Sequence, residues 1–339
     1  MTATMPAGVA TARDLVGPAI AAATERLSQD VRPVVSYHLG LAGLDGQPSR
    51  QPASGKALRP ALALLSARAV GAPAERALPA AVAVELVHNF SLLHDDIMDG
   101  DTERRHRPTA WSAFGVGPAI LAGDALLALA HDLLLEGPAP QGMWASRCLL
   151  AAVQRLIAGQ GADLAFERRD DVTITECLDM AADKTAALMA CACSIGAIYV
   201  GGPAATAMAL AGFGAQIGLA FQLTDDLLGI WGAPEVTGKP VRSDLRARKR
   251  SLPVVAALTS GTDAGGDLAA LLASPDPLTE SELVRAAELT DEAGGRKWVE
   301  AEADAAMASA KDSLGEAEIP DDVRAELSGI AEFITARQW

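Results

Sequence analysis

One acidic stretch decides the fold of this chain: Leu93-His94-Asp95-Asp96-Ile97-Met98-Asp99. It follows apolar residues that recur at helical spacing, which predicts a helix directed into a core. On such a helix Asp95 and Asp99 share a face and can hold one hard cation between successive turns. Arg104 and Arg105 come one short loop later. Because Mg²⁺ prefers oxygen ligands and usually shares them with substrate phosphates, this arrangement suits Mg²⁺ bound to a diphosphate.

A second stretch resembles the first: Phe221-Gln222-Leu223-Thr224-Asp225-Asp226-Leu227-Leu228-Gly229. It also places paired carboxylates at the end of a long apolar segment. A single Asp-Asp pair is most often a helix end or a solvated turn. Two pairs, each followed by basic residues, favour a shared site, because ionised carboxylates near a core are costly without a compensating cation. We expect the two acidic stretches to face each other across a bundle cavity.

Composition indicates a large helical protein. The chain has 339 residues, of which 50% are hydrophobic and only 4% aromatic. Alanine and leucine favour helices, and no stretch alternates long enough to predict a strand. The net charge of −15 excludes nucleic acid as a partner, because phosphate backbones require a basic surface. The four cysteines fit no zinc spacing and are typical of a reduced compartment.

The segment from Thr185 to Thr224 carries no charge, and two interpretations of it are open. By length and composition it resembles a membrane hairpin. Gly201-Gly202-Pro203 splits it into two helices, however, and helices that are apolar all round also form the centre of a large bundle. We favour the buried core and a chain that does not span a membrane. With no signal peptide in the sequence, we expect a cytoplasmic protein.

Further motifs follow one another in order over about residues 50 to 255. They are Gly55-Lys56-Ala57-Leu58-Arg59-Pro60, Glu85-Leu86-Val87-His88, the first acidic stretch with Arg104-Arg105, Gly159-Gln160 with Asp163, Lys184-Thr185, Gln222 with Asp225-Asp226, and the lysines Lys239 and Lys249. In this set and order the chain resembles the trans-isoprenyl diphosphate synthases, also called polyprenyl synthetases. Each motif alone is weak, whereas the ordered set is highly specific.

The resemblance implies an all-α fold: one large helical bundle of the isoprenoid synthase type with a central active-site cavity. Residues 1–339 would form a single domain, with the core motifs in about 50–255 and the helices of about 256–339 packed outside. The resemblance also implies a homodimer.

The resemblance further implies a prenyltransferase with three Mg²⁺ ions in each active site. The expected direct metal ligands are Asp95, Asp99 and Asp225, and Asp96 and Asp226 would act through metal-bound waters. The small-molecule partners would be isopentenyl diphosphate and an allylic diphosphate. The residues for isopentenyl diphosphate would be Lys56, Arg59, His88 and Arg105. Those for the allylic diphosphate would be Arg104, Lys184, Lys239 and Lys249. Catalysis would use Lys184 and Lys239 to add positive charge at the leaving group, and Thr185 and Gln222 to direct oxygen dipoles at the carbocation.

The chain departs from the family pattern at three positions. Gly229 stands where many members carry a third aspartate, so we expect the outer coordination of one metal to depend more on water. Ala57 replaces a residue that is often basic, and His106 stands where glycine often follows the arginine pair.

Product length depends on the turn before Asp95. Phe90 and Ser91 would form the floor of the apolar pocket. In this family an aromatic residue followed by a small one resembles enzymes that make twenty-carbon geranylgeranyl diphosphate. Products of fifteen carbons, or of twenty-five and more, are the alternatives.

Three other functions are compatible with a helical chain of this kind: a terpene cyclase, a regulatory subunit and a scaffold protein. A class I terpene cyclase of the same fold would also ionise an allylic diphosphate with Mg²⁺. A cyclase has no reason to keep a second diphosphate pocket, so the residues for isopentenyl diphosphate favour condensation. A regulatory subunit of a heteromeric synthase should have lost its acidic stretches, and a helical scaffold protein would not explain them.

Overall fold

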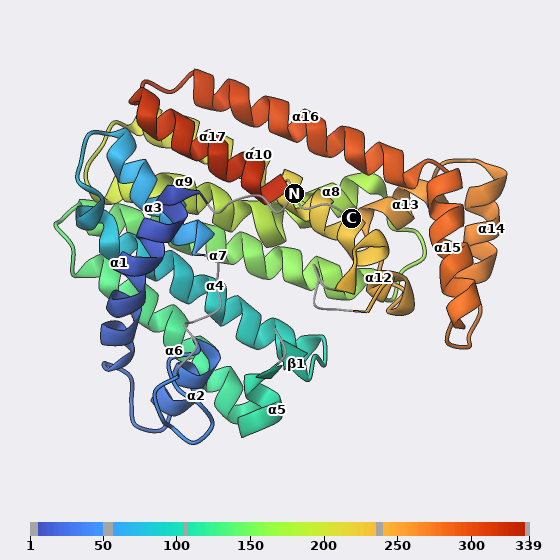
Figure 1. The fold of residues 1–339 in the computed structure, drawn as a ribbon, viewed down its shortest axis with the longest axis horizontal. Helices are drawn as coiled ribbons and strands as arrows, with labels where there is room; N and C mark the ends of the chain where they lie inside the picture. The colour runs from blue at the N-terminus through green and yellow to red at the C-terminus, as the bar shows by residue number, and fades with distance from the viewer. Residues whose placement is uncertain (1–5, 50–56, 105–106, 235–239, 336–339) are drawn as a thin grey trace. The chain divides into compact units, whose positions relative to one another are not determined.

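The computed structural model describes residues 6–49, 57–104, 107–234 and 240–335. These residues are mostly helical, and the all-α prediction is confirmed (Figure 1). The chain divides into two compact units. The amino-terminal unit comprises Met1–Val153, Cys191–Ala211 and Leu314–Ile330. The carboxy-terminal unit comprises Gln154–Ala190, Gly212–Ser313 and Ala331–Trp339. A single domain over 1–339, with a central cavity, stays a prediction.

The first acidic stretch belongs to the amino-terminal unit. The helices that lie wholly in this unit are α1 (Ala7–Thr24), α2 (Arg32–His38), α3 (Leu58–Ala69), the 3₁₀ turn η1 (Ala74–Ala77), α4 (Leu78–Met98), α5 (Ala110–Phe114) and α6 (Val116–Leu135). Other helices begin in one unit and end in the other: α7 (Gln141–Phe166), α9 (Ala187–Tyr199), α10 (Ala204–Trp231), α16 (Gly295–Gly315) and α17 (Asp321–Thr335).

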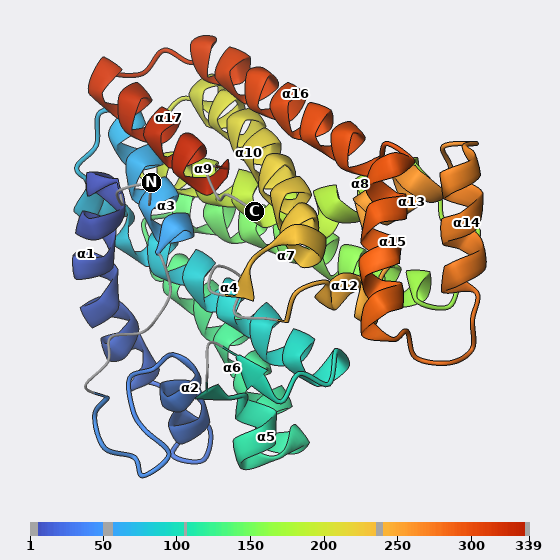
Figure 2. The same ribbon diagram turned by 45° about the vertical axis from the view of Figure 1, so that its right-hand side comes forward.

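Helix α4 carries the first acidic stretch at its carboxyl end. Pro79 lies in its first turn, where a proline costs no helical hydrogen bond. Leu86 and Leu93 are 0% and 1% exposed, as their helical spacing predicts. The helix packs along α3 and α6 (Figures 1 and 2). Each buried leucine contributes about 2 kcal/mol relative to exposure to water, and this burial holds the acidic end of α4 in place.

A short hairpin follows α4, although the sequence predicts no strand. Strands β1 (Glu103–Arg104) and β2 (Arg107–Pro108) pair antiparallel, with Arg104 opposite Arg107. Strands this short cannot show an alternating pattern, which explains why the sequence does not reveal them.

The second acidic stretch belongs to the carboxy-terminal unit. The helices that lie wholly in this unit are α8 (Ile174–Ala181), the π-helical turn η2 (Ala182–Ala186), α12 (Ser243–Arg246), α13 (Leu252–Leu258), α14 (Asp263–Leu272) and α15 (Glu280–Glu292). Leu227 and Ile230 of α10 and Leu283 of α15 are fully buried in its core clusters. Helices α14 and α15 lie side by side (Figure 2).

The uncharged segment forms α9 and the first part of α10, with Gly201-Gly202-Pro203 between them as predicted. Four helical stretches among the described residues are long and apolar enough to cross a membrane: Ala74–Met98, Val116–Leu135, Ile174–Tyr199 and Ala204–Trp231. The buried share of the most apolar window is 67% in the first and third of these, 39% in the second and 44% in the fourth. The bundle-core interpretation therefore fits Ile174–Tyr199 better than Ala204–Trp231.

Candidate active site

The two carboxylates of the first acidic stretch that are expected to bind metal remain accessible. Asp95 is partly exposed and Asp99 is exposed. Asp99 directly follows α4, and its backbone N–H donates to the carbonyl of Asp95 at 2.8 Å. The helical backbone therefore continues to Asp99 and places both side chains on one face, in the geometry that the spacing predicts.

Asp96 has a different environment. It is 1% exposed, and Arg104 donates from Nε to its Oδ1 at 2.7 Å. Burial raises the pKa of Asp96, and the positive charge of Arg104 opposes that rise. The ion pair links α4 to the hairpin and fixes Arg104 beside the acidic stretch. This pairing gives Asp96 a positioning role that the sequence does not reveal, and its role through metal-bound water stays a prediction.

A small cavity of about 40 Å³ adjoins this ion pair. Its lining includes Tyr37, Asn89, Asp96, Arg104 and Arg107. The second oxygen of Asp96 is buried with no hydrogen-bond partner among the described residues. The cavity has room for about one or two water molecules, which could satisfy that oxygen.

Two of the four residues predicted for isopentenyl diphosphate lie in the described part of the chain. Arg59 extends from α3 and His88 from α4, and the two helices pack together. Burial lowers the pKa of Arg59, and the negative charge of Glu85 opposes this. Arg59 is partly buried, so its guanidinium has already lost part of its hydration and binds a further anion at a lower desolvation cost. Lys56 and Arg105 lie outside the described residues.

The residues predicted to set product length are buried in the same unit. Phe90 is 6% and Ser91 7% exposed. The Phe90 ring packs edge-on against His94 at a centroid distance of 4.9 Å. His94 Nε2 lies 3.1 Å from the carbonyl oxygen of Ile120 in α6, and this contact helps to hold both rings. His94 thus contacts α6, and Phe90 packs against His94.

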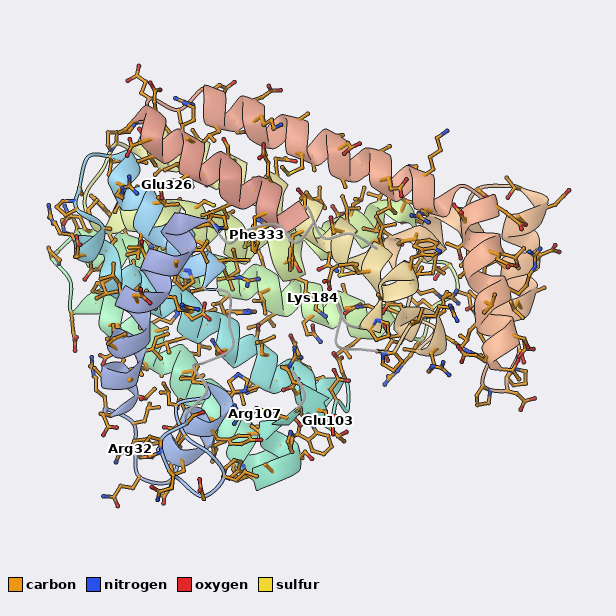
Figure 3. The ribbon with its side chains drawn as sticks, viewed as in Figure 1. Arg32, Glu103, Arg107, Lys184, Glu326 and Phe333 are labelled. Atoms are coloured by element: carbon orange, nitrogen blue, oxygen red, sulfur yellow. The ribbon has the colours of Figure 1, made fainter. Side chains whose placement is uncertain are left out.

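In the carboxy-terminal unit, one carboxylate brings together two lysines predicted to bind diphosphate. Lys184 Nζ lies 2.5 Å and Lys249 Nζ 3.7 Å from Oδ2 of Asp163 (Figure 3 labels Lys184). The pKa of Asp163 is lowered, because attraction to the two ammonium groups outweighs the effect of its burial. Asp163 thus neutralises part of the positive charge of the two lysines, which would otherwise attract a diphosphate. The sequence identifies its motif without revealing this role.

Lys184 and Thr185 lie in the π-helical turn η2. Such turns insert an extra residue into a helix and often occur at functional sites. Gly159 of α7 approaches this turn closely, since a Cβ on Gly159 would stand 2.3 Å from the backbone nitrogen of Lys184. Glycine is therefore required at position 159 for Lys184 to approach α7.

A chain of hydrogen bonds leads from Thr185 to the second acidic stretch. Thr185 Oγ1 donates to Oε1 of Gln222 at 2.6 Å, and Nε2 of Gln222 donates to Oδ1 of Asp226 at 2.7 Å. Oδ2 of Asp226 accepts from the backbone N–H of Leu252 at 2.9 Å. The hydroxyl proton of Thr185 is thus used in this hydrogen bond, which leaves the lone pairs of its oxygen for a cation.

Asp225 and Asp226 differ as Asp95 and Asp96 do. Asp225 is exposed, whereas Asp226 is 3% exposed. Burial raises the pKa of Asp226 to about 6; Lys249 opposes the rise, and the negative charge of Asp244 adds to it. In each pair the first carboxylate is more exposed to solvent, whereas the second is buried and hydrogen-bonded to the protein.

The donor chemistry of these residues fits Mg²⁺. No group of three or more His, Cys, Asp or Glu side chains within the ranges that the structure covers could hold a metal on its own. A Mg²⁺ ion would therefore take one or two carboxylates and complete its octahedron with substrate oxygens and water, which is its usual mode of binding. Lys239, like His106, lies outside the described residues, so its predicted role is not placed.

Residues 48–289 match the polyprenyl synthetase family. The chain belongs to this family. It is 49% identical to a (2E,6E)-farnesyl diphosphate synthase of Mycobacterium tuberculosis over 96% of this chain and 92% of that protein. It is 44% identical to a geranylgeranyl diphosphate synthase of the same organism, with the same coverage.

Solved structures agree. The fold matches a polyprenyl synthetase from Streptomyces coelicolor with a TM-score of 0.92 and 47% identity, over 97% of this chain and 98% of that one. It also matches a geranylgeranyl pyrophosphate synthase from Corynebacterium glutamicum, complexed with isoprenyl diphosphate and magnesium. In that case the TM-score is 0.84 and the identity 28%, over 99% of this chain and 100% of the other. The chain is thus a trans-isoprenyl diphosphate synthase of a Mg²⁺-dependent family, and the prediction of a prenyltransferase is confirmed.

Proposed function

We propose that this enzyme condenses isopentenyl diphosphate with allylic diphosphates and releases geranylgeranyl diphosphate as its main product. The observation that carries the product length is the placement of Phe90 and Ser91. Phe90 is buried and packs against His94, which contacts α6, and the small Ser91 beside it is also buried. A side chain fixed in this way sets the depth of an apolar pocket more sharply than a mobile one would.

Ionisation of the allylic diphosphate requires positive charge at the leaving group. Mg²⁺, when bound through Asp95, Asp99 and Asp225, supplies most of that charge, and we propose three ions in each active site. Lys184 and Lys249 exchange part of their bonding to Asp163 for the diphosphate. Lys239 and Arg104 are proposed to contact the same group. Thr185 and Gln222 direct oxygen dipoles at the allylic cation.

The second substrate would be bound by the amino-terminal unit. Arg59 and His88, with Lys56 and Arg105, hold the diphosphate of isopentenyl diphosphate so that its double bond can attack the allylic carbon. The proton that leaves the product goes to the released diphosphate. A second set of diphosphate-binding residues supports condensation over cyclisation, because a terpene cyclase takes only one diphosphate substrate.

A fifteen-carbon product is the second candidate, and the higher identity to a farnesyl diphosphate synthase favours it. The test supplies the purified enzyme with Mg²⁺, isopentenyl diphosphate and, in turn, the five-, ten- and fifteen-carbon allylic diphosphates. We expect all three to be extended to twenty carbons. Arrest at fifteen carbons would replace the proposed product with farnesyl diphosphate.

We also propose a cytoplasmic homodimer that does not span the membrane. Apolar side chains are exposed on α6 and α7 of the amino-terminal unit: Val116, Ile120, Leu121, Leu135, Met143, Trp144 and Leu150. A second copy of the chain would remove them from water, which is the usual reason for such a patch. Light scattering on the wild type and on Trp144→Lys tests this, and a monomeric wild type would contradict it.

A further inference from the structure

A tyrosine outside the family match contacts the hairpin that carries Arg104. The match covers residues 48–289, whereas Tyr37 lies earlier in the chain, in α2. Its side chain is buried, and Tyr37 as a whole is only 4% exposed. The Tyr37 hydroxyl donates to the carbonyl oxygen of Pro108 in β2 at 2.8 Å. This bond joins residues 71 positions apart in the sequence, and it attaches β2 to α2.

Arg107 gives β2 a second attachment to the same tyrosine. Its guanidinium lies over the Tyr37 ring, 4.5 Å from the ring centroid, and donates to the backbone carbonyl of Tyr37 at 3.3 Å (Figure 3 labels Arg107). A guanidinium in this position is attracted by the negative face of the aromatic ring. The ring itself packs edge-on against Phe114 of α5, at a centroid distance of 5.4 Å. Tyr37 therefore holds β2 through its hydroxyl, its ring and its carbonyl group.

These contacts keep two like charges apart. Arg104 and Arg107 lie directly opposite each other in the hairpin. Like charges in such a pair are destabilising. Arg104 pairs with Asp96, whereas Arg107 lies on Tyr37, and all four residues line the cavity of about 40 Å³. By holding Arg107, Tyr37 leaves the Asp96 carboxylate to Arg104, and that ion pair uses only one of the five N–H donors of the Arg104 guanidinium.

Helix α2 is a firm support for these contacts. Val34 and Val35 of α2 are buried, and the helix packs against α5 and α6. The base of the hairpin is closed by other groups: Thr109 Oγ1 and Trp111 Nε1 donate to the carbonyl oxygen of Asp101, at 2.9 and 2.8 Å. Loss of the contacts with α2 should therefore displace β2 and leave the base of the hairpin closed.

We propose that Tyr37 is a positioning residue for Arg104. It holds β2, which pairs with β1, and β1 carries Arg104 beside the first acidic stretch. The proposal rests on the proposed function, in which Arg104 contacts the allylic diphosphate. Without Tyr37 the hairpin would have to be ordered when the diphosphate binds, and the cost of that ordering weakens binding. Tyr37 acts on the substrate only through the hairpin.

The first test makes the same substitution at the two tyrosines of the chain. Tyr37→Phe removes the bond to Pro108 and keeps the ring beneath Arg107. We expect the KM for the ten-carbon allylic diphosphate to rise about three- to tenfold, the range of one lost hydrogen bond, with kcat changed less than about twofold. Tyr199→Phe is the matched control. Tyr199 is also buried, but it lies beside Gly137, beyond the end of α6 that is far from the hairpin, so the KM should not change.

A double-mutant cycle tests whether Tyr37 acts through Arg104. Arg104→Met removes the guanidinium, so adding Tyr37→Phe to it should change the KM less than about twofold. A tyrosine that only stabilised the fold would lower the melting temperature, and its effect on the KM would multiply with that of Arg104→Met. Melting curves show whether each variant is folded. If Arg104→Met is not, Arg104→Lys takes its place, because lysine keeps the charge and lacks the planar guanidinium.

The outcomes separate the inference from the function. An unchanged KM in Tyr37→Phe, or fold-changes that multiply in the cycle, would show that the inference is wrong, while formation of prenyl diphosphates by the wild type would leave the function standing. The same cycle is measured by calorimetry as the Kd for inorganic diphosphate in the presence of Mg²⁺. A wild type that forms no prenyl diphosphate, but whose diphosphate binding couples Tyr37 to Arg104, would overturn the function alone.

Discussion

The two acidic stretches share the same pattern of exposed and buried carboxylates and differ in the groups that bond to the buried one. In each, the first aspartate is accessible and the second is nearly fully buried. Asp96 is bonded to the guanidinium of Arg104, whereas Asp226 is bonded to the amide groups of Gln222 and Leu252. The first stretch thus anchors its helix with a charged partner, and the second does so with neutral ones.

The stretches also differ in how many carboxylates one helix presents. Asp95 and Asp99 occupy successive turns of one face, whereas glycine follows Asp225 at the equivalent turn of α10. A metal site at the second stretch therefore depends more on each of its carboxylates. The same short motif thus presents carboxylates on successive turns of one face in the first stretch and on one turn only in the second.

The largest expected effect concerns the accessible carboxylates. Asp225→Asn should lower kcat/KM by about 10²–10³-fold, the range seen when one preorganised charge-stabilising group is removed. Asp99→Asn should cost only about tenfold, because Asp95 remains on the same helix face. Steady-state kinetics at saturating Mg²⁺ measure both. Equal losses of kcat/KM in the two variants would contradict this, because each acidic stretch would then depend equally on a single carboxylate.

A second prediction contrasts the buried carboxylates. Asp96→Asn should lower the free energy of unfolding by about 2–3 kcal/mol, because it leaves Arg104 without its charged partner; solvent around Arg104 keeps the loss below that of a fully buried pair. Asp226→Asn should cost less than about 1 kcal/mol at pH 7. Its loss of one hydrogen bond is offset by removal of a buried negative charge. Urea unfolding of both variants checks this, and a larger loss for Asp226→Asn would contradict it.

Much of this pattern follows from the sequence. Apolar spacing locates α4 and α10, and the acidic pairs mark the ends of these helices that are proposed to bind metal. Which member of each pair is buried cannot be read from spacing, because it depends on partners such as Arg104 and Leu252 from other segments. The π-helical turn around Lys184 is hidden for a similar reason, since the composition of the segment favours any helix. Asp163 shows the same limit: its motif is recognisable, but its pairing with two lysines requires the fold.

The smallest expected effect is the pH dependence of the second buried carboxyl. The pKa of Asp226 is about 6 in the folded protein and 3.8 is its ordinary value, so between these values the folded state binds more protons than the unfolded state. Wild-type stability should therefore decline as the pH rises from about 4 to about 6, and Asp226→Asn should not show this part of the decline. We expect the variant to gain stability relative to the wild type over that range, with a slope of at most about 1.4 kcal/mol per pH unit. Urea unfolding in EDTA between pH 4 and pH 7 measures the difference without metal, with Asp267→Asn on the exposed surface of α14 as control. A constant difference across that range would mean that Asp226 titrates near its ordinary pKa, and that Lys249 and the hydrogen bonds to Asp226 offset the full cost of burying its charge.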